Sequence, residues 1–274
     1  MSVVAIFGAG PTGSAIAHKI AERARVREIR LIDDNAAVAS GKALDIRQSG
    51  PIGRFDTDLS ATSDPLAATG ADAIVFADRV DGGEWEGETA LTLAGRLVRA
   101  GAGGPFVFSG SKQIWLMEAV VRELKVAENR VVGTAGSAVA IAVGALAGVE
   151  LGLTGVQVAV VGRPPAFVVG WSSATVGGSL VSDRVPAHRL LAISQSLPRL
   201  WPPAPQATGA ASAIVIEALI SGSRRLHHAL TVLDGNPGPR GTASMLPLEL
   251  GQGRVLRRVL PSLSPQERTS LGIG

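Results

Sequence analysis

Residues 3–14 read VVAIFGAGPTGS, an apolar run that passes through a glycine-rich turn into a helical pattern. The run 3–7 predicts a buried strand, and Gly8, Gly10 and Gly13 follow it with the spacing GxGxxG. In such a unit the first glycine permits the tight turn, the second lets backbone approach a pyrophosphate, and the third lets helix pack on strand. Because the helix N-terminus also offers unpaired N–H groups to phosphates, the stretch predicts a dinucleotide-binding unit.

The next predicted strand, 28–33, ends in Asp33, twenty positions beyond Gly13. A carboxylate there can accept hydrogen bonds from the adenosine ribose, and its charge disfavours a 2′-phosphate, so NAD is the predicted cofactor rather than NADP. The alternative is a turn kept only for packing, with Asp33 as an ordinary cap. The predicted cofactor-binding residues are Gly8, Gly10, Pro11, Thr12, Gly13, Asp33 and Ala77, the last of which ends a third buried run.

The first half of the chain alternates apolar runs with helical patterns, and this alternation predicts an α/β fold, a Rossmann-type doubly wound parallel sheet covered on both faces. After residue 155 the pattern changes to strands separated by Gly and Pro, with helices at 186–200 and 209–221 and a capped closing helix from Ser264. We therefore predict a NAD-binding domain at 1–134 and an α+β domain at 135–274. An apolar helix over 135–149 lies between the two patterns.

Composition limits the function classes. Hydrophobic residues make up 46% of the chain and charged residues 18%, which is enough for a large core. The net charge is +3, but the arginines are scattered without interleaved aromatic residues, so no nucleic-acid partner is expected. The absence of cysteine excludes disulfide and thiolate chemistry. Residues 135–149 are shorter than the ~20 residues of a membrane span, and no targeting pattern precedes the first strand, so we expect a cytoplasmic protein without a membrane partner.

Several segments together resemble the lactate/malate dehydrogenase family, and the resemblance runs nearly end to end. The resemblance implies a Rossmann fold, NAD as cofactor, hydride transfer to a 2-hydroxy acid, and assembly into a homo-oligomer. The segments that carry it are IFGAGPTGS (6–14), LID (31–33), GKALDI (41–46), ADAIV (71–75), WSSATVGG (171–178) and LPLELG (246–251).

The departures from the family pattern fall on the chemistry. The position of the arginine that polarises the substrate carbonyl is Glu88, in a shortened loop, and the family's Asn-Pro becomes Ser-Gly-Ser at 109–111. The orienting aspartate and the carboxylate-binding arginine would be Val139 and Ala142. The stretch with the proton-transferring histidine reads GRPP at 162–165, which offers no group that titrates near neutral pH.

The predicted function is therefore a lactate/malate dehydrogenase-like NAD-binding protein that is catalytically degenerate, a pseudoenzyme acting as sensor or partner subunit, with any small-molecule substrate in doubt. One alternative is an NAD-dependent oxidoreductase that acts on a hydroxy acid or other hydroxy compound with non-standard catalytic residues. Another is a structural oligomer with a vestigial cleft. No catalytic residue and no metal site are predicted. Arg163 is the one replacement candidate, expected to point toward the nicotinamide end. The remaining titratable candidates are better explained as structural: His18, His188, His227 and His228.

Overall fold

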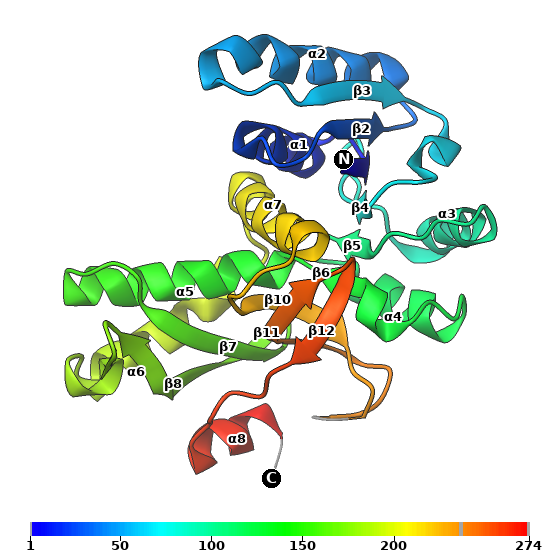
Figure 1. Cartoon of the computed structure of the whole chain (residues 1–274). Coiled ribbons are helices and arrows are strands. Elements are labelled where there is room, and N and C mark those ends of the chain that lie inside the picture. The colour runs from blue at the N-terminus through cyan, green and yellow to red at the C-terminus, as the bar shows by residue number, and fades with distance from the viewer. Residues whose placement is uncertain (1, 236–237, 273–274) are drawn as a thin grey trace.

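In a computed structural model of the chain, which describes residues 2–235 and 238–272, twelve strands of the described part form one continuous mixed sheet (Figure 1). Its order is β3-β2-β1-β4-β5-β6-β10-β11-β7-β8-β9, and β12 pairs with β11. The first six strands are parallel and follow the doubly wound order, which confirms the predicted fold class. The strands of this half are β1 (Val3–Phe7), β2 (Glu28–Ile32), β3 (Asp58–Thr62), β4 (Ala73–Phe76), β5 (Phe106–Phe108) and β6 (Val131–Gly133).

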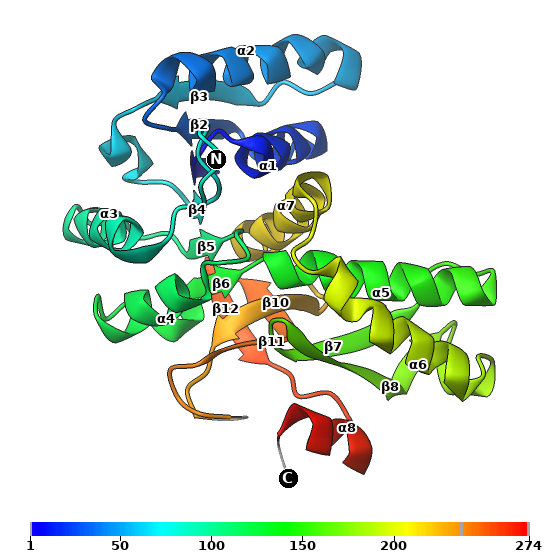
Figure 2. The same cartoon turned by 180° about the vertical axis from the view of Figure 1, so that it is seen from behind.

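Helices cover both faces of the parallel sheet. Figures 1 and 2 show α1 and α7 packed side by side on one face and α3 and α4 on the other. Two buried apolar clusters correspond to these two faces. Because the strands are buried on both sides, they read as continuous apolar runs. The helices of this half are α1 (Pro11–Arg23), α2 (Ala36–Gly53), α3 (Gly87–Arg99), α4 (Ile114–Arg122) and the short η1 (Pro65–Ala68) and η2 (Glu128–Arg130).

The second half joins the same sheet through an antiparallel pair, in which β10 lies beside β6 with Leu230 opposite Gly133. No break in the sheet accompanies the predicted boundary between 134 and 135, so that division stays a prediction, and its last residues, 273 and 274, lie outside the described residues. The elements are α5 (Ala135–Leu151), β7 (Gln157–Arg163), β8 (Ala166–Val176), β9 (Ser179–Leu180), η3 (Val181–Asp183), α6 (Ala187–Ser196), η4 (Leu197–Leu200), α7 (Pro205–Ser221), β10 (His227–Val232), β11 (Ala243–Gly251), β12 (Arg254–Arg258) and α8 (Pro265–Leu271).

Local differences from the predicted elements have simple causes. Strand β3 is not recognisable in the sequence, because its residues are mostly polar and it lies at the edge of the sheet. The predicted helix 186–200 ends as an α-helix at Ser196 and continues as the 3₁₀ turn η4, where Pro198 has no N–H to donate. Ser264 caps α8 with a reciprocal bond to Glu267, as predicted. None of the described helices combines the length and apolarity that a bilayer crossing requires.

Candidate functional site

The glycine turn connects β1 to α1 at the carboxyl edge of the parallel strands. Gly8 has a φ of +104°, a backbone conformation that side chains with a Cβ rarely adopt. A Cβ on Gly13 would lie 1.9 Å from the carbonyl oxygen of Gly8, so only glycine lets α1 begin this close to the strand. The turn therefore has the backbone geometry that the sequence predicts.

The segment that follows β4 lies directly on this turn. The N–H of Gly10 donates to the carbonyl of Asp78 at 2.9 Å. A Cβ on Gly10 would lie 2.5 Å from the carbonyl oxygen of Arg79 and 2.8 Å from Cγ of Asp78. The close approach that Gly10 permits is thus made by the protein's own chain.

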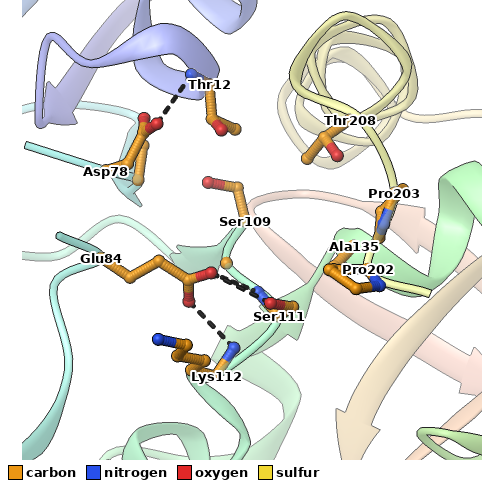
Figure 3. Close-up of a pocket in the computed structure, with 12 residues that line it drawn as sticks. Thr12, Asp78, Glu84, Ser109, Ser111, Lys112, Ala135, Pro202, Pro203 and Thr208 are labelled. Carbon is orange, nitrogen blue, oxygen red and sulfur yellow. Dashed lines mark hydrogen bonds between the residues drawn. The ribbon is translucent and has the colours of Figure 1, made fainter. Parts of the chain in front are cut away.

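The carboxylate of Asp78 binds the N-terminus of α1. Its Oδ2 accepts from the N–H of Thr12 at 3.0 Å (Figure 3). Its Oδ1 accepts from the N–H of Gly13 at 2.8 Å. Pro11, the first residue of the helix, has no N–H to offer. A negative group at this helix end is stabilised both by the unpaired amides and by the helix dipole. Asp78 is therefore bound where the sequence predicts a phosphate.

Asp33 lies at the end of β2 beside the turn, but it is turned into the protein and only 3% exposed. Its Oδ2 accepts from the N–H groups of Ala9 at 2.9 Å and Val80 at 3.1 Å, and its Oδ1 accepts from the N–H of Asn35 at 3.0 Å. The structure brings Asp33 together with the predicted turn residues. Both of its oxygens are already hydrogen-bonded to backbone, however.

The shortened loop after Ala77 is a closed hairpin. Asp78 and Glu84 form an antiparallel bridge at its base, and the N–H of Arg79 donates to the carbonyl of Gly83 at 2.7 Å. The guanidinium of Arg79 lies 5.3 Å from the ring centre of Trp85. We call residues 78–84 the cleft hairpin. Ala77 itself is buried, and its N–H donates to Phe7 at 2.9 Å, which fixes the hairpin to β1.

Glu84, on the other strand of the hairpin, binds the segment that precedes α4. Its Oε1 accepts from both the N–H and the hydroxyl of Ser111 at 3.0 Å, and its Oε2 accepts from the N–H of Lys112 at 2.9 Å (Figure 3). This segment includes the Ser-Gly-Ser at 109–111, which the sequence resemblance sets against the family's Asn-Pro. Here too a carboxylate of the hairpin satisfies backbone amides that face the cleft.

A pocket of about 250 Å³ lies between these two contacts. Among the described residues that line it, Lys112 is the one cation and none is a histidine. Lys112 is exposed, so solvent screens its charge. The pocket is lined by Thr12, Ala77, Asp78, Glu84, Ser109, Gly110, Ser111, Lys112, Ala135, Pro202, Pro203 and Thr208.

The other positions singled out in the sequence lie apart from this pocket. Arg163, at the end of β7, forms an ion pair with Glu118 of α4 and donates to the carbonyl of Ala243 at 3.2 Å. It is not among the described residues that line the pocket. Val139 is buried in α5, and Glu88 is exposed in the first turn of α3. The structure therefore gives Arg163 a contact with α4 in place of the expected direction toward the nicotinamide end.

The histidines also lie outside the pocket. His18 is 3.3 Å from Glu22 on α1, and His188 is exposed on α6. His227 shares a 2.8 Å hydrogen bond with Ser223. Burial, together with the charge of His227, lowers the pKa of His228 to about 4, and its Nε2 has no hydrogen-bond partner in the described part of the chain. His18 lines a second hollow beside Gly10 and Pro11, and the structural role of the four histidines stays a prediction.

Sequence reasoning missed Asp78 and Glu84, which make the principal contacts of the cleft. One signal was present: Asp78 follows the buried run 73–77 directly, at the same sheet edge as the glycine turn. With the amides of Thr12 and Gly13 bonded to Asp78, and with Asp33 buried, a dinucleotide does not fit the turn while the hairpin is in this position. We therefore derive no chemical step through it.

Comparison with known proteins relates the chain to dehydrogenases. No family model matches it. A malate dehydrogenase of Cytophaga hutchinsonii is 26% identical over 97% of this chain and 92% of its own length. Local matches are stronger but short: malate dehydrogenases of Chlorobium phaeobacteroides and Staphylococcus carnosus are 37% and 49% identical over 27% of this chain, and these matches span only about a quarter (24%) of each relative.

Solved structures share the fold over nearly the whole chain. A minor L-lactate dehydrogenase from Enterococcus mundtii superposes with a TM-score of 0.88 at 19% identity, covering 99% of this chain and 94% of its own. A malate dehydrogenase from Salinibacter ruber gives 0.86 at 23% identity, covering 98% and 93%. At these identities the likeness establishes the fold. Together with the 26% identity along almost the full length, it makes the chain similar in sequence to a malate dehydrogenase and similar in fold to lactate and malate dehydrogenases.

Proposed function

We propose that this chain is a catalytically degenerate member of its family, a sensor or partner subunit that does not oxidise 2-hydroxy acids. We call the 250 Å³ pocket described above the inner pocket. The carboxylates of Asp78 and Glu84, which line it, support the proposal most directly. A 2-hydroxy acid is itself an anion and needs a fixed cation in a site shielded from water. Two carboxylates and one exposed lysine supply the opposite charge balance.

Proton transfer is the second requirement that the pocket does not meet. Oxidation of a hydroxyl needs a base that titrates near neutral pH within hydrogen-bond reach. The described lining offers carboxylates bonded to backbone and four hydroxyls, those of Thr12, Ser109, Ser111 and Thr208. NAD remains the candidate ligand, because the chain has the GxGxxG turn and is similar to proteins named malate and lactate dehydrogenase. The homo-oligomer and the cytoplasmic location stay predictions.

The test is turnover by the purified chain. Malate, oxaloacetate, lactate and pyruvate are each offered with NAD or its reduced form, and the absorbance of the reduced nicotinamide is followed. We expect no rate above a mock purification from cells that lack the chain. A rate that follows the protein through purification overturns the proposal. The Arg163→Ala variant, measured in parallel, shows whether such a rate depends on the one replacement candidate.

A second candidate function follows from the same charge balance. An acidic pocket lined by four hydroxyl-bearing side chains favours a neutral or cationic hydroxy compound over a carboxylic acid. The chain would then be an oxidoreductase with non-standard catalytic residues. A screen of alcohols, polyols and amino alcohols with NAD, followed at the same absorbance, separates this candidate from the first, since it alone predicts formation of reduced nicotinamide.

A further inference from the structure

We propose that Asp78 is a built-in substitute for a ligand phosphate, and that the cleft hairpin keeps nucleotides out until this carboxylate leaves the N-terminus of α1. The inference rests on the proposed ligand class, a nicotinamide dinucleotide, and adds to it a regulation of the same site.

The first argument is the number of donors. A phosphate at this turn depends on unpaired backbone N–H groups in the first turn of the helix. Pro11 contributes none, and the next two donors, Thr12 and Gly13, point at the two oxygens of Asp78. A pyrophosphate would therefore have to replace the carboxylate on the same two amides.

The second argument is charge. Two anions that share one pair of donors repel each other, and Asp78 is held in place by the bridge to Glu84 at the base of the hairpin. The lysines among the described residues that line the two hollows of the cleft, Lys42 and Lys112, are both exposed, so solvent screens the charge that would offset a second negative group. Removal of the Asp78 carboxylate should therefore strengthen the binding of phosphates rather than weaken it.

The third argument is the fixed position of the segment 78–80. Its backbone is bonded to the turn through Gly10 at one end and to Asp33 through Val80 at the other. The same contacts that bring the segment over the turn also occupy the carboxylate predicted to bind the ribose. Nucleotide entry thus requires movement of the hairpin at both places.

The experiment compares the wild-type protein with Asp78→Ala, Asp78→Asn and the matched control Asp81→Ala. Asp81 lies on the same hairpin, carries the same charge and is 68% exposed, and its contacts in the described chain stay within the hairpin, to Arg79 and to the N–H of Gly83. Inorganic pyrophosphate and NAD are titrated by calorimetry, and adenosine serves as a probe without phosphate. We expect the Asp78 variants to bind pyrophosphate and NAD about tenfold tighter than wild type, the scale of a charge-assisted hydrogen bond, while Asp81→Ala binds as wild type does.

Thermal unfolding gives a second readout, because the Asp78 variants lose the group that caps α1. Their Tm should fall and be restored by added pyrophosphate, whereas the Tm of wild type and Asp81→Ala should rise less at the same pyrophosphate concentration. Equal pyrophosphate affinity in wild type and both Asp78 variants, or a gain shared by Asp81→Ala, overturns the inference. Turnover of a 2-hydroxy acid by the wild type overturns the proposed function instead, so the two failures are distinguishable.

Discussion

The glycine turn and the inner pocket lie at two ends of one cleft, and they differ in how much of the family pattern they keep. At the turn the sequence pattern is complete, from Gly8 to Asp33, and the backbone has the expected geometry. At the inner pocket the pattern is lost. Yet the two ends share one feature, because at each of them backbone N–H groups donate to a carboxylate of the cleft hairpin. This carboxylate is Asp78 at the turn and Glu84 at the pocket.

The difference teaches that a retained motif and a retained ligand site are separate properties. Backbone amides at a helix end need an acceptor whether or not a cofactor supplies it. Glycines that shape the turn remain necessary for packing even when the acceptor is a side chain of the same protein. Sequence patterns report the backbone requirement, and they do not report which acceptor satisfies it.

The largest expected effect is at the turn itself. Gly13→Ala places a Cβ 1.9 Å from the carbonyl oxygen of Gly8, so the free energy of unfolding should fall by about 3 kcal/mol. Gly41→Ala is the matched control, because nothing lies within 4 Å of a Cβ there, and it should stabilise α2 by about 0.5–1 kcal/mol. Urea denaturation measures both, and equal stabilities would mean that the turn is not under packing constraint.

Protonation of His228 changes the free energy of unfolding with pH. This effect must be subtracted before the pH dependence of the two ends of the cleft is compared. The pKa of His228 in the folded protein is about 4, below the ordinary 6.5. The contribution of neutral His228 to stability is therefore complete above pH 6.5 and declines as the pH falls toward 4. Between pH 7 and pH 5 this site should cost on the order of 2 kcal/mol of unfolding free energy. His228→Phe should remove that loss in denaturation curves at the two pH values. An unchanged loss would assign the acid sensitivity to other groups.

Next in size is the inner end. Glu84→Ala leaves the N–H groups of Ser111 and Lys112 without their acceptor, and the free energy of unfolding should fall by about 1.5 kcal/mol. Glu86→Ala, two residues away and exposed, makes no cap bond to α3 and should change stability by less than about 0.5 kcal/mol. If the two variants are equally stable in urea, the hydrogen bonds of Glu84 do not stabilise the protein. The carboxylates at the two ends of the cleft would then have different roles.

The smallest effect is expected at Arg163. Its side chain is 48% exposed, so Arg163→Ala should cost less than about 1 kcal/mol, similar to Arg257→Ala, which breaks the exposed pair with Glu249. Neither change should alter affinity for pyrophosphate or NAD in calorimetric titrations. An altered affinity in Arg163→Ala alone would extend the functional cleft to β7.

The sequence predicts the fold well and the site only in part. Periodicity, the glycine spacing and the Ser264 cap depend on neighbours in the chain, so they can be read locally. The contacts of Asp78 and Glu84 depend on where a closed hairpin places them against segments up to 66 positions away. The ion pair of Arg163 with Glu118 likewise joins elements distant in the chain. Such pairings follow from tertiary packing, and no local pattern encodes them.

The pairing of β10 with β6 has a consequence for motion. Each strand from β3 to β9 is hydrogen-bonded to the next in the sheet order. The two halves of the protein therefore share one sheet and are not separate domains joined by a hinge. Swinging one half against the other would break this seam. If ligands enter the cleft, we expect the movement to be confined to short surface segments such as the cleft hairpin after β4.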